Sequence, residues 1–341
     1  MKAAVVERPG ELVVRDIPEP AMGPYEARCQ VLFGAVCTGT DQHLIAGRFP
    51  WPVKYPTVLG HESIGRVTEV GERVRHLAPG DLVTRVGVPA LPEQDLSVNW
   101  GGFAEVALAR DHRAMAEDGR PESEWRSHRI NQKLPADADP AAATMIITWR
   151  ETLSYATRLG VGPGSRVLVL GSGGNGLAFV SHAAHLGAAC IAAVGSPARE
   201  AAARRAGAQA YVDYHADDLA AALRPWGPFD FAIDAVGKAG QADRALPALA
   251  QGGALGVYGI DDFHGLRLNP RLAPGTFTWY NGGYDEAEVH DRVVALVAAG
   301  RLDASIWLDL SHPYPLAQIG PAIEALRQRR QVKALIRISG P

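Results

Sequence analysis

A glycine-rich segment near the middle of the chain has the spacing of a dinucleotide-binding loop. After an apolar strand at 167–170 come Gly171, Gly173, Gly174, Asn175 and Gly176, which form a Gly-x-Gly-x-x-Gly pattern and open a helix. In such a loop the first glycine makes a tight turn, the second lets the backbone approach a pyrophosphate, and the third allows close helix–strand contact. The strand–turn–helix context favours dinucleotide binding over a merely tight structural turn.

The end of the next expected strand indicates which dinucleotide is bound. An Asp or Glu roughly 20 residues beyond the glycines usually binds the ribose 2′-hydroxyl of NAD. This chain has Gly195 and Ser196 there, so no carboxylate repels a 2′-phosphate. Arg199 could supply a positive charge and Ser196 a hydroxyl donor, which favours NADP(H). The alternative is that Arg199, with 204 and 205, is an ordinary solvated helix face that leaves cofactor choice loose.

The elements that must position this loop predict an α/β protein with two domains. A chain of 341 residues exceeds a usual single core. Short alternating segments separated by Gly and Pro turns fill the first ~145 residues and indicate a β domain. From residue 167 onward, apolar strands alternate with Ala-rich helical stretches, which indicates a doubly wound parallel sheet.

Composition and charge exclude several classes of protein. Hydrophobic residues make up 47% and charged residues 21% of the chain, a globular balance, and the net charge of −3 offers no broad positive field for nucleic acid. No apolar run approaches the ~20 residues that span a bilayer, and the first residues lack a signal-peptide pattern. We therefore expect a cytoplasmic protein with no membrane partner. Three scattered cysteines predict reduced thiols rather than a disulfide framework.

Further motifs resemble the zinc-containing alcohol dehydrogenase family of medium-chain dehydrogenases/reductases. Besides the glycine loop they are Gly60-His61-Glu62-x-x-Gly65-x-Val67, Pro79-Gly80-Asp81-x-Val83, Gly101-Gly102-Phe103-Ala104-Glu105 and Val161-x-Pro163-Gly164. The resemblance implies a GroES-like catalytic domain over 1–148, a Rossmann NADP-binding domain over 149–284, and a segment over 285–341 that returns to the catalytic domain. It also implies hydride transfer between nicotinamide and an alcohol or carbonyl carbon.

A narrower resemblance concerns the cofactor. Gly195, Ser196 and Tyr214 match the NADP-dependent bacterial secondary-alcohol dehydrogenases, in which these positions adjoin the 2′-phosphate. The arginine that follows the serine in those enzymes is Pro197 here. The phosphate site of this chain must therefore differ from theirs.

The family's catalytic zinc has three protein ligands, and only one of the three positions, the histidine, is matched directly in this chain. His61 matches the histidine ligand, and Glu62 matches the neighbouring glutamate close to the metal. Thr40 and His43 keep the spacing of the family's proton relay, which puts Thr38 on the first ligand position and Cys37 one residue too early. Cys37 can bind zinc only if the extra residue bulges out, because Zn–S bonds of ~2.3 Å tolerate little error.

The last ligand position is the least clear. Counting back from the glycine loop places Ile147 at this position, and isoleucine cannot bind a metal. Glu151 resembles the ligand in the corresponding segment of polyol dehydrogenases, but it lies four residues downstream of Ile147, ~6 Å along a helix. A zinc site made from Cys37, His61, Glu62 and Glu151 thus competes with a zinc-free site, in which Thr40 with His43 polarises the carbonyl. A weaker alternative is that His61 and Glu62 only hold each other. The four cysteines of the family's structural zinc do not occur, so that zinc is expected to be absent.

Three functions remain open at this point. The first is NADP(H)-dependent interconversion of an alcohol (secondary alcohol, polyol or sugar-like) and its carbonyl, with zinc assistance. The second is zinc-free NADPH-dependent reduction of a ketone, imine or activated double bond, and the third is a non-catalytic, nucleotide-binding structural role. For the enzymes the partner is a small carbonyl or alcohol substrate. The segment 276–280 resembles the family's exposed edge strand, which predicts a homodimer or homotetramer.

Overall fold

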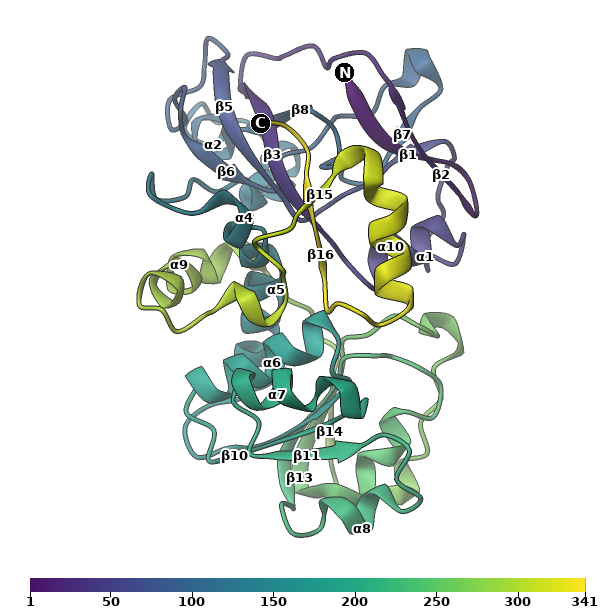
Figure 1. Ribbon diagram of the computed structural model, residues 1–341. Coiled ribbons are helices and arrows are strands. Elements are labelled where there is room, and N and C mark those ends of the chain that lie inside the picture. Colours follow the sequence, from purple (N-terminus) through teal and green to yellow (C-terminus); the bar gives the residue numbers. More distant parts are fainter. Residues whose placement is uncertain (341) are drawn as a thin grey trace. The chain divides into compact units, whose positions relative to one another are not determined.

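The computed structural model describes residues 1–340, which form two compact units (Figure 1). Of the described residues, the first unit contains 1–147, 290–298 and 303–340. The second contains residues 148–289 and 299–302. The C-terminal part of the chain thus folds with the N-terminal part.

The first unit is built on two β-sheets. The larger has the order β15 (Tyr314–Pro315), β16 (Ala334–Arg337), β3 (Glu26–Val36), β5 (Ser63–Val70) and β6 (Leu82–Thr84), and β8 (Val106–Arg110) also pairs with β3. The smaller has the order β2 (Glu11–Asp16), β1 (Lys2–Arg8), β4 (Thr57–Val58) and β7 (Ser97–Val98). Apolar side chains fill two clusters, and β1 contributes to both because its alternate side chains, Ala4 and Val6 on one face and Ala3 and Val5 on the other, are all buried. The predicted β domain is confirmed.

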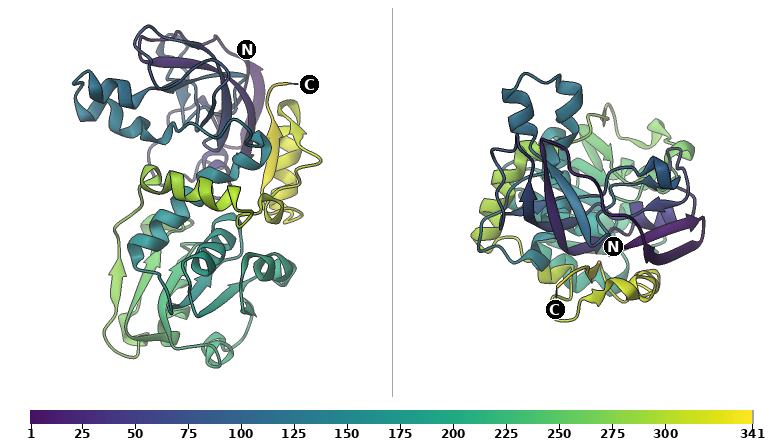
Figure 2. Two further views of the ribbon diagram at one scale, coloured as in Figure 1. Left: turned by 90° about the vertical axis from the view of Figure 1, so that its left-hand side faces the viewer. Right: turned by 90° about the horizontal axis from the view of Figure 1, so that it is seen from above.

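Short helices complete this unit. They are α1 (Thr40–Ile45), α2 (His112–Glu117), α3 (Glu122–Trp125), α4 (Pro140–Ala143), α9 (His290–Ala298) and α10 (Ile319–Arg327). Ile319, Ala322, Ile323 and Leu326 form the buried face of α10, which lies beside β16. The helices α2 and α3 occupy the polar, poorly periodic stretch 112–132 and protrude from the sheets (Figure 2). Asp111 caps α2 by accepting a hydrogen bond from the backbone N–H of Ala114.

The second unit is a parallel six-stranded sheet. Its order is β11 (Ala210–Asp213), β10 (Cys190–Gly195), β9 (Arg166–Leu170), β12 (Phe229–Asp234), β13 (Leu249–Val257) and β14 (Thr278–Tyr280). Its helices are α5 (Met145–Leu159), whose first turn belongs to the first unit, α6 (Gly174–His185), α7 (Glu200–Ala206) and α8 (Leu219–Leu223). The strand order reverses between β9 and β12, which is the switch point where doubly wound sheets bind ligands. The predicted Rossmann fold is confirmed.

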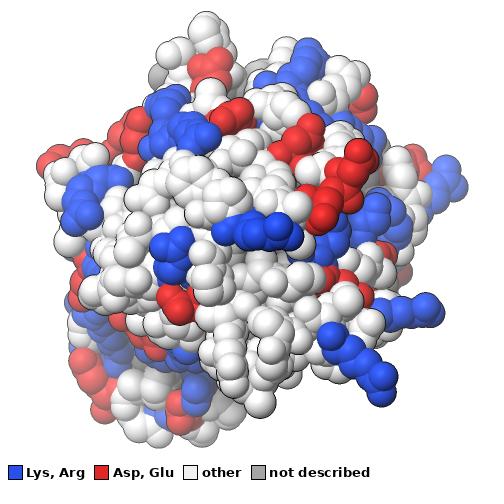
Figure 3. All heavy atoms as spheres, turned by 90° about the horizontal axis from the view of Figure 1, so that it is seen from below, with Lys and Arg blue, Asp and Glu red and all other residues white. Residues whose placement is uncertain are grey.

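The edge and surface of the second unit bear on partners. The strand β14 lies at the edge of the sheet, and Trp279 on it is 38% exposed. Pairing of this edge across a dimer stays a prediction. Figure 3 shows acidic and basic side chains interspersed on one face. Within residues 1–340, no helix has both the length and the apolar character needed to cross a membrane.

Candidate active site

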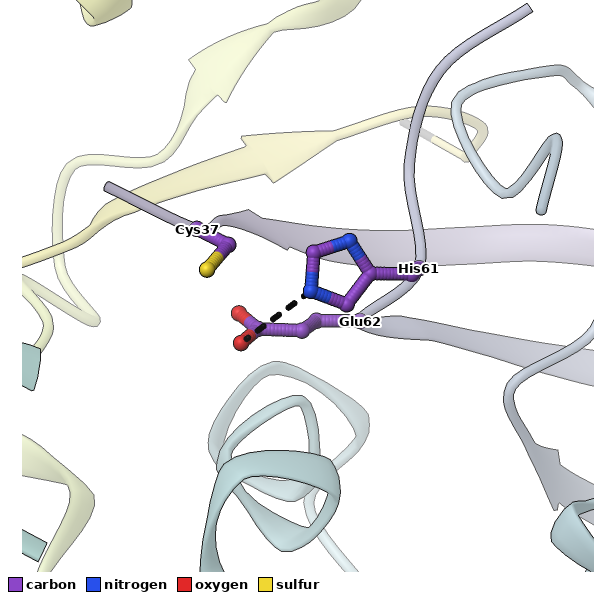
Figure 4. A group of neighbouring side chains, drawn as sticks. All are labelled: Cys37, His61 and Glu62. Carbon is purple, nitrogen blue, oxygen red and sulfur yellow. Dashed lines mark ion pairs between the residues drawn. The ribbon is translucent and has the colours of Figure 1, made fainter. Parts of the chain in front are cut away.

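Three buried side chains of the first unit bring potential metal ligands together. Cys37 follows β3, and His61 and Glu62 precede β5. One ligand atom from each lies within 4.8 Å of the other two, and Figure 4 shows the thiol, imidazole and carboxylate converging. Sulfur, nitrogen and oxygen donors of these types bind zinc, and three protein ligands leave a fourth coordination position open, as in catalytic zinc sites. We refer to these residues as the Cys37–His61–Glu62 group.

Strand pairing explains why residues so far apart meet. The strands β3 and β5 are antiparallel, with Gly34 opposite Ser63, so the end of one lies beside the start of the other. Gly60 precedes His61 with a φ of +99°, and a Cβ there would lie 2.6 Å from Phe103. Only glycine accommodates both this left-handed backbone and the nearby ring. The Gly-His-Glu motif therefore reflects a turn that aims His61 inward.

The first candidate ligand is Cys37 rather than Thr38. Residues 38–39 form a turn ahead of α1, and this turn takes up the extra residue that the sequence shows between Cys37 and the relay. The backbone N–H of Cys37 donates to Asp41 Oδ2 at 2.9 Å, which fixes the start of the turn. Cys37, whose thiol lies near His61 and Glu62, therefore stays the candidate for the first ligand position.

Asp41 orients the imidazole of His61. Its carboxylate is fully buried, and its Oδ1 lies 3.6 Å from Nδ1 of His61, so Nε2 faces Glu62, with Oε1 at 3.9 Å. Burial by itself lowers the pKa of His61, but the nearby Asp41 and Cys37 outweigh it and raise that pKa well above its ordinary value. Carboxylates in this position behind a histidine fix the ring orientation of metal ligands.

Lys333 is a second neighbour of the group. Its ammonium contacts both carboxylate oxygens of Glu62, although the two residues are 271 positions apart. Lys333 lies just before β16, whose first residue, Ala334, pairs with Val36 next to Cys37. Nothing local in the sequence marks Lys333 as part of the site, because only the pairing of β16 with β3 brings it there.

The two relay candidates lie on α1. Thr40 is half-buried and begins the helix, and His43 is buried one turn later. Nδ1 of His43 lies 2.8 Å from the carbonyl oxygen of Gly39, and because a carbonyl oxygen can only accept, Nδ1 is the donor. Their roles stay predictions.

Aromatic side chains border the group. The ring of Trp100 lies 5.1 Å from the His61 ring between centroids, and Phe49 lies 6.3 Å from Trp100 and 5.1 Å from Trp51. We call Phe49, Trp51 and Trp100 the aromatic row. The sequence analysis missed Trp100, since its proximity to His61 depends on a loop whose path has no sequence signal.

Glu151 belongs to the second unit. It lies on α5, where its Oε2 accepts a hydrogen bond at 2.8 Å from the hydroxyl of Tyr258. On the preceding position, the Arg150 guanidinium forms a buried ion pair with Glu286 at 2.9 Å. The Cys37–His61–Glu62 group already offers three donors without Glu151, and the ligand role of Glu151 stays untested.

The glycine loop has the geometry that phosphate binding requires. Gly171 has a φ of +105°, and a Cβ on Gly176 would lie 2.0 Å from the carbonyl oxygen of Gly171. A Cβ on Gly173 would meet nothing within 4 Å, so the backbone there is open to a ligand. The helix α6 begins at Gly174, with Asn175 in its first turn. The N-terminus of a helix in this position can bind an anion through its backbone N–H groups.

Tyr211 is a cofactor-site candidate that the sequence analysis missed. A Cβ on Gly195, at the end of β10, would lie 2.5 Å from the Tyr211 hydroxyl, and that hydroxyl donates at 2.6 Å to the carbonyl oxygen of Ser196. Tyr214 donates its backbone N–H to the carbonyl oxygen of Gly195, while its ring stacks on His215. Arg199 ends the short helical turn that follows Ser196. The predicted residues thus cluster at one strand end, with Tyr211 holding the backbone.

Comparisons with known proteins agree with this geometry. The alcohol dehydrogenase GroES-like domain matches residues 23–117, and the zinc-binding dehydrogenase domain matches residues 174–275. The chain belongs to the zinc-containing alcohol dehydrogenase family. It is therefore an oxidoreductase of that family, as the motifs predict.

Relatives within the family include enzymes of sugar and polyol chemistry. The chain is 28% identical to L-galactonate-5-dehydrogenase of Escherichia coli K12, with 98% of each chain covered, and 28% identical to a putative D-xylulose reductase of Rhizobium meliloti, with 95% and 96% covered. A solved structure of a putative zinc-binding dehydrogenase from Sinorhizobium meliloti 1021, bound to NADP, superposes with a TM-score of 0.79 at 26% identity over 98% of both chains.

Proposed function

We propose that this protein is an NADP(H)-dependent dehydrogenase that interconverts a sugar-derived or polyol alcohol and its carbonyl, with zinc held by the Cys37–His61–Glu62 group. The convergence of these buried donors within 4.8 Å carries the metal part of the proposal. The substrate class rests on the two relatives, whose names specify L-galactonate and D-xylulose. Both compounds are polyhydroxylated carbon chains.

The residues divide the chemistry among themselves. When bound, zinc would supply a Lewis acid that polarises the oxygen of the substrate. Asp41 keeps the His61 ring aimed at the group. In the oxidative direction the substrate hydroxyl gives its proton to the Thr40 hydroxyl, which passes one on to Nε2 of His43. Nε2 is the nitrogen assigned this role because Nδ1 donates to the carbonyl oxygen of Gly39.

The cofactor part of the proposal rests on the end of β10. Since Gly195 and Ser196 stand where NAD-dependent enzymes carry a carboxylate, a 2′-phosphate meets no carboxylate there. Arg199 adds positive charge, and the Tyr211 hydroxyl fixes the carbonyl of Ser196 so that the adjoining backbone is rigid. The NADP-bound relative supports the same preference. The diphosphate would lie at the N-terminus of α6, with the hydride exchanged at the nicotinamide.

One observation favours a second candidate, the zinc-free NADPH reductase. The Lys333 ammonium already balances the charge of the Glu62 carboxylate, so the site is neutralised on that side without a metal. In that enzyme Thr40 and His43 would polarise and protonate a carbonyl. The two candidates differ in metal content and in the effect of a chelator.

Metal analysis joined to a cofactor assay tests the proposal. Purified protein should contain about one zinc per chain, should reduce D-xylulose or oxidise L-galactonate, and should use NADP(H) in preference to NAD(H). Full activity in protein stripped of metal would select the zinc-free reductase. Failure of well-folded protein to bind either nucleotide by calorimetry would overturn both candidates.

A further inference from the structure

Within residues 1–340, four non-glycine residues have a positive φ, and two of them lie against His61. They are Arg85, with a φ of +57°, and Trp100, with a φ of +66°. Arg85 Nε donates to the carbonyl oxygen of His61 at 3.0 Å, and the Trp100 ring lies 5.1 Å from the His61 ring. Such residues cost free energy and persist only where their surroundings determine the backbone, most often at ligand sites.

The backbone at Trp100 is held in this conformation by its neighbours. A Cβ on Gly87 would lie 1.8 Å from the carbonyl oxygen of Trp100, so the two segments are in close contact. The next residues are anchored as well, because Val88 donates to the carbonyl of Gly101 and Gly102 donates to the carbonyl of Gly60. Glycine would adopt this backbone without strain. The indole must therefore serve a purpose that outweighs the strain.

Core packing is not that purpose. Trp100 is 39% exposed, and Trp51, at the other end of the aromatic row, is 49% exposed. The row runs from His61 to the surface, with Phe49 meeting Trp100 at 85° and Trp51 at 60° between ring planes. A substrate oxygen at the Cys37–His61–Glu62 group would lie near Trp100, because the Trp100 ring is 5.1 Å from the His61 ring.

The chemistry of the row indicates what lies on it. Aromatic faces carry negative charge and attract groups of positive polarity. In a polyhydroxylated chain, each C–H bond next to a hydroxyl has a positively polarised hydrogen, and one face of the chain presents several of them together. A short alcohol presents too few carbons to cover the ring. The Arg85 guanidinium, 6.0 Å from the Trp100 ring, already occupies part of the surrounding space and restricts the approach.

We propose that Trp100 is a specificity-determining residue, whose exposed ring contacts the polyhydroxylated carbon chain of the substrate beside the reacting carbon. The proposal rests on the proposed function and adds to it the residue that selects the substrate. Trp100 then favours sugar-derived chains over short alcohols through contact area, and it takes no part in the transfer of hydride or proton.

Replacement by glycine separates this role from a structural one. Trp100→Gly relieves the positive φ, so the midpoint of thermal unfolding should not fall, whereas a structural tryptophan would make it fall. With NADPH, we expect the KM for D-xylulose to rise about five- to tenfold, as loss of one aromatic contact predicts, and kcat/KM to fall more for D-xylulose than for acetone. Trp100→Phe, which keeps a smaller ring, should lie between the two.

Three outcomes would overturn the proposal. The first is an equal loss of kcat/KM for D-xylulose and acetone, and the second is an unchanged KM for D-xylulose. The third is a larger loss for benzyl alcohol than for L-galactonate, which would assign the row to aromatic substrates. If no variant turns over, the proposed function fails, and calorimetry of D-xylulose with NADP-loaded protein decides instead. Weaker binding to Trp100→Gly than to wild type supports the contact, while equal binding, or none to wild type, overturns it.

Discussion

The ammonium of Lys333 contacts both carboxylate oxygens of Glu62, and each of the two side chains is 1% exposed. The structure thus places a positive charge directly behind one donor of the candidate metal group. A metal ion that binds Glu62 must share the carboxylate with this lysine. The pair can therefore set how tightly the group holds a cation.

Removing the charge of Lys333 should strengthen zinc binding. In Lys333→Met the Glu62 carboxylate loses its counterion, which for a buried pair costs ~3–5 kcal/mol of folding free energy, and zinc becomes the only cation that can restore it. Without metal, we expect the variant to unfold at a lower temperature than wild type, and added zinc should raise its unfolding temperature by more. In competition with a chelator, the variant should bind zinc at least about tenfold more tightly than wild type.

Lys333→Arg is the matched control, because it keeps the charge and a buried donor. Its zinc affinity should stay within a few-fold of wild type. Equal zinc affinity in Lys333→Met and wild type would show that the lysine does not compete for the carboxylate. Glu62→Gln should weaken zinc binding, since it removes a charged donor while keeping the side-chain shape.

Asp41 should act on the metal through His61. Asp41→Asn keeps the size of the side chain and can still accept from the N–H of Cys37, but it removes the charge 3.6 Å from His61 Nδ1. Loss of a carboxylate behind a histidine ligand typically costs 10–100-fold in metal affinity. Chelator competition should show a drop of that order with little change in NADPH binding. An unchanged zinc affinity would mean that His61 keeps its orientation without Asp41.

The choice of cofactor should respond to charge at the end of β10. Ser196→Asp introduces the carboxylate that this strand end lacks, so the Kd for NADPH should rise about tenfold or more, with a smaller change for NADH. Ser196→Ala controls for loss of the hydroxyl alone. Arg199→Ala should also weaken NADPH more than NADH. Fluorescence titration measures all three, and equal effects on the two nucleotides would show that the 2′-phosphate lies elsewhere.

Local patterns allowed most of the fold and the cofactor loop to be predicted. The tight turn at Gly171 and the close contact at Gly176 involve residues only a few positions apart, so their spacing in the sequence was enough to predict both. Cys37 was harder, because its position depends on a two-residue turn that the sequence leaves ambiguous. Lys333 and Trp100 could not be predicted. The first reaches Glu62 through strand pairing across 271 positions, and the second reaches His61 through a backbone conformation that favours glycine.

The last prediction concerns Asp234 at the switch point of the Rossmann sheet. It ends β12 and pairs with Leu170 beside the glycine loop. Its Oδ1 accepts from the N–H groups of Val236 and Gly237, while its buried Oδ2 has no hydrogen-bond partner within residues 1–340. Burial raises the pKa of Asp234 from 3.8 to about 6, although those two N–H groups act in the opposite direction.

The sign of the pH dependence follows from this raised pKa. The folded state binds the proton more tightly than the unfolded state, so the stabilisation is complete below about pH 4 and is lost as the pH rises to about 6. A shift from 3.8 to about 6 is about 2 units, or at most about 3 kcal/mol. Asp234→Asn removes this titration and keeps an acceptor for both N–H groups. We therefore expect the unfolding free energy of wild type, measured with urea from pH 4 to 7, to fall relative to that of the variant as the pH rises. A difference that stays flat would mean that water reaches Oδ2 and that Asp234 ionises normally in the folded protein.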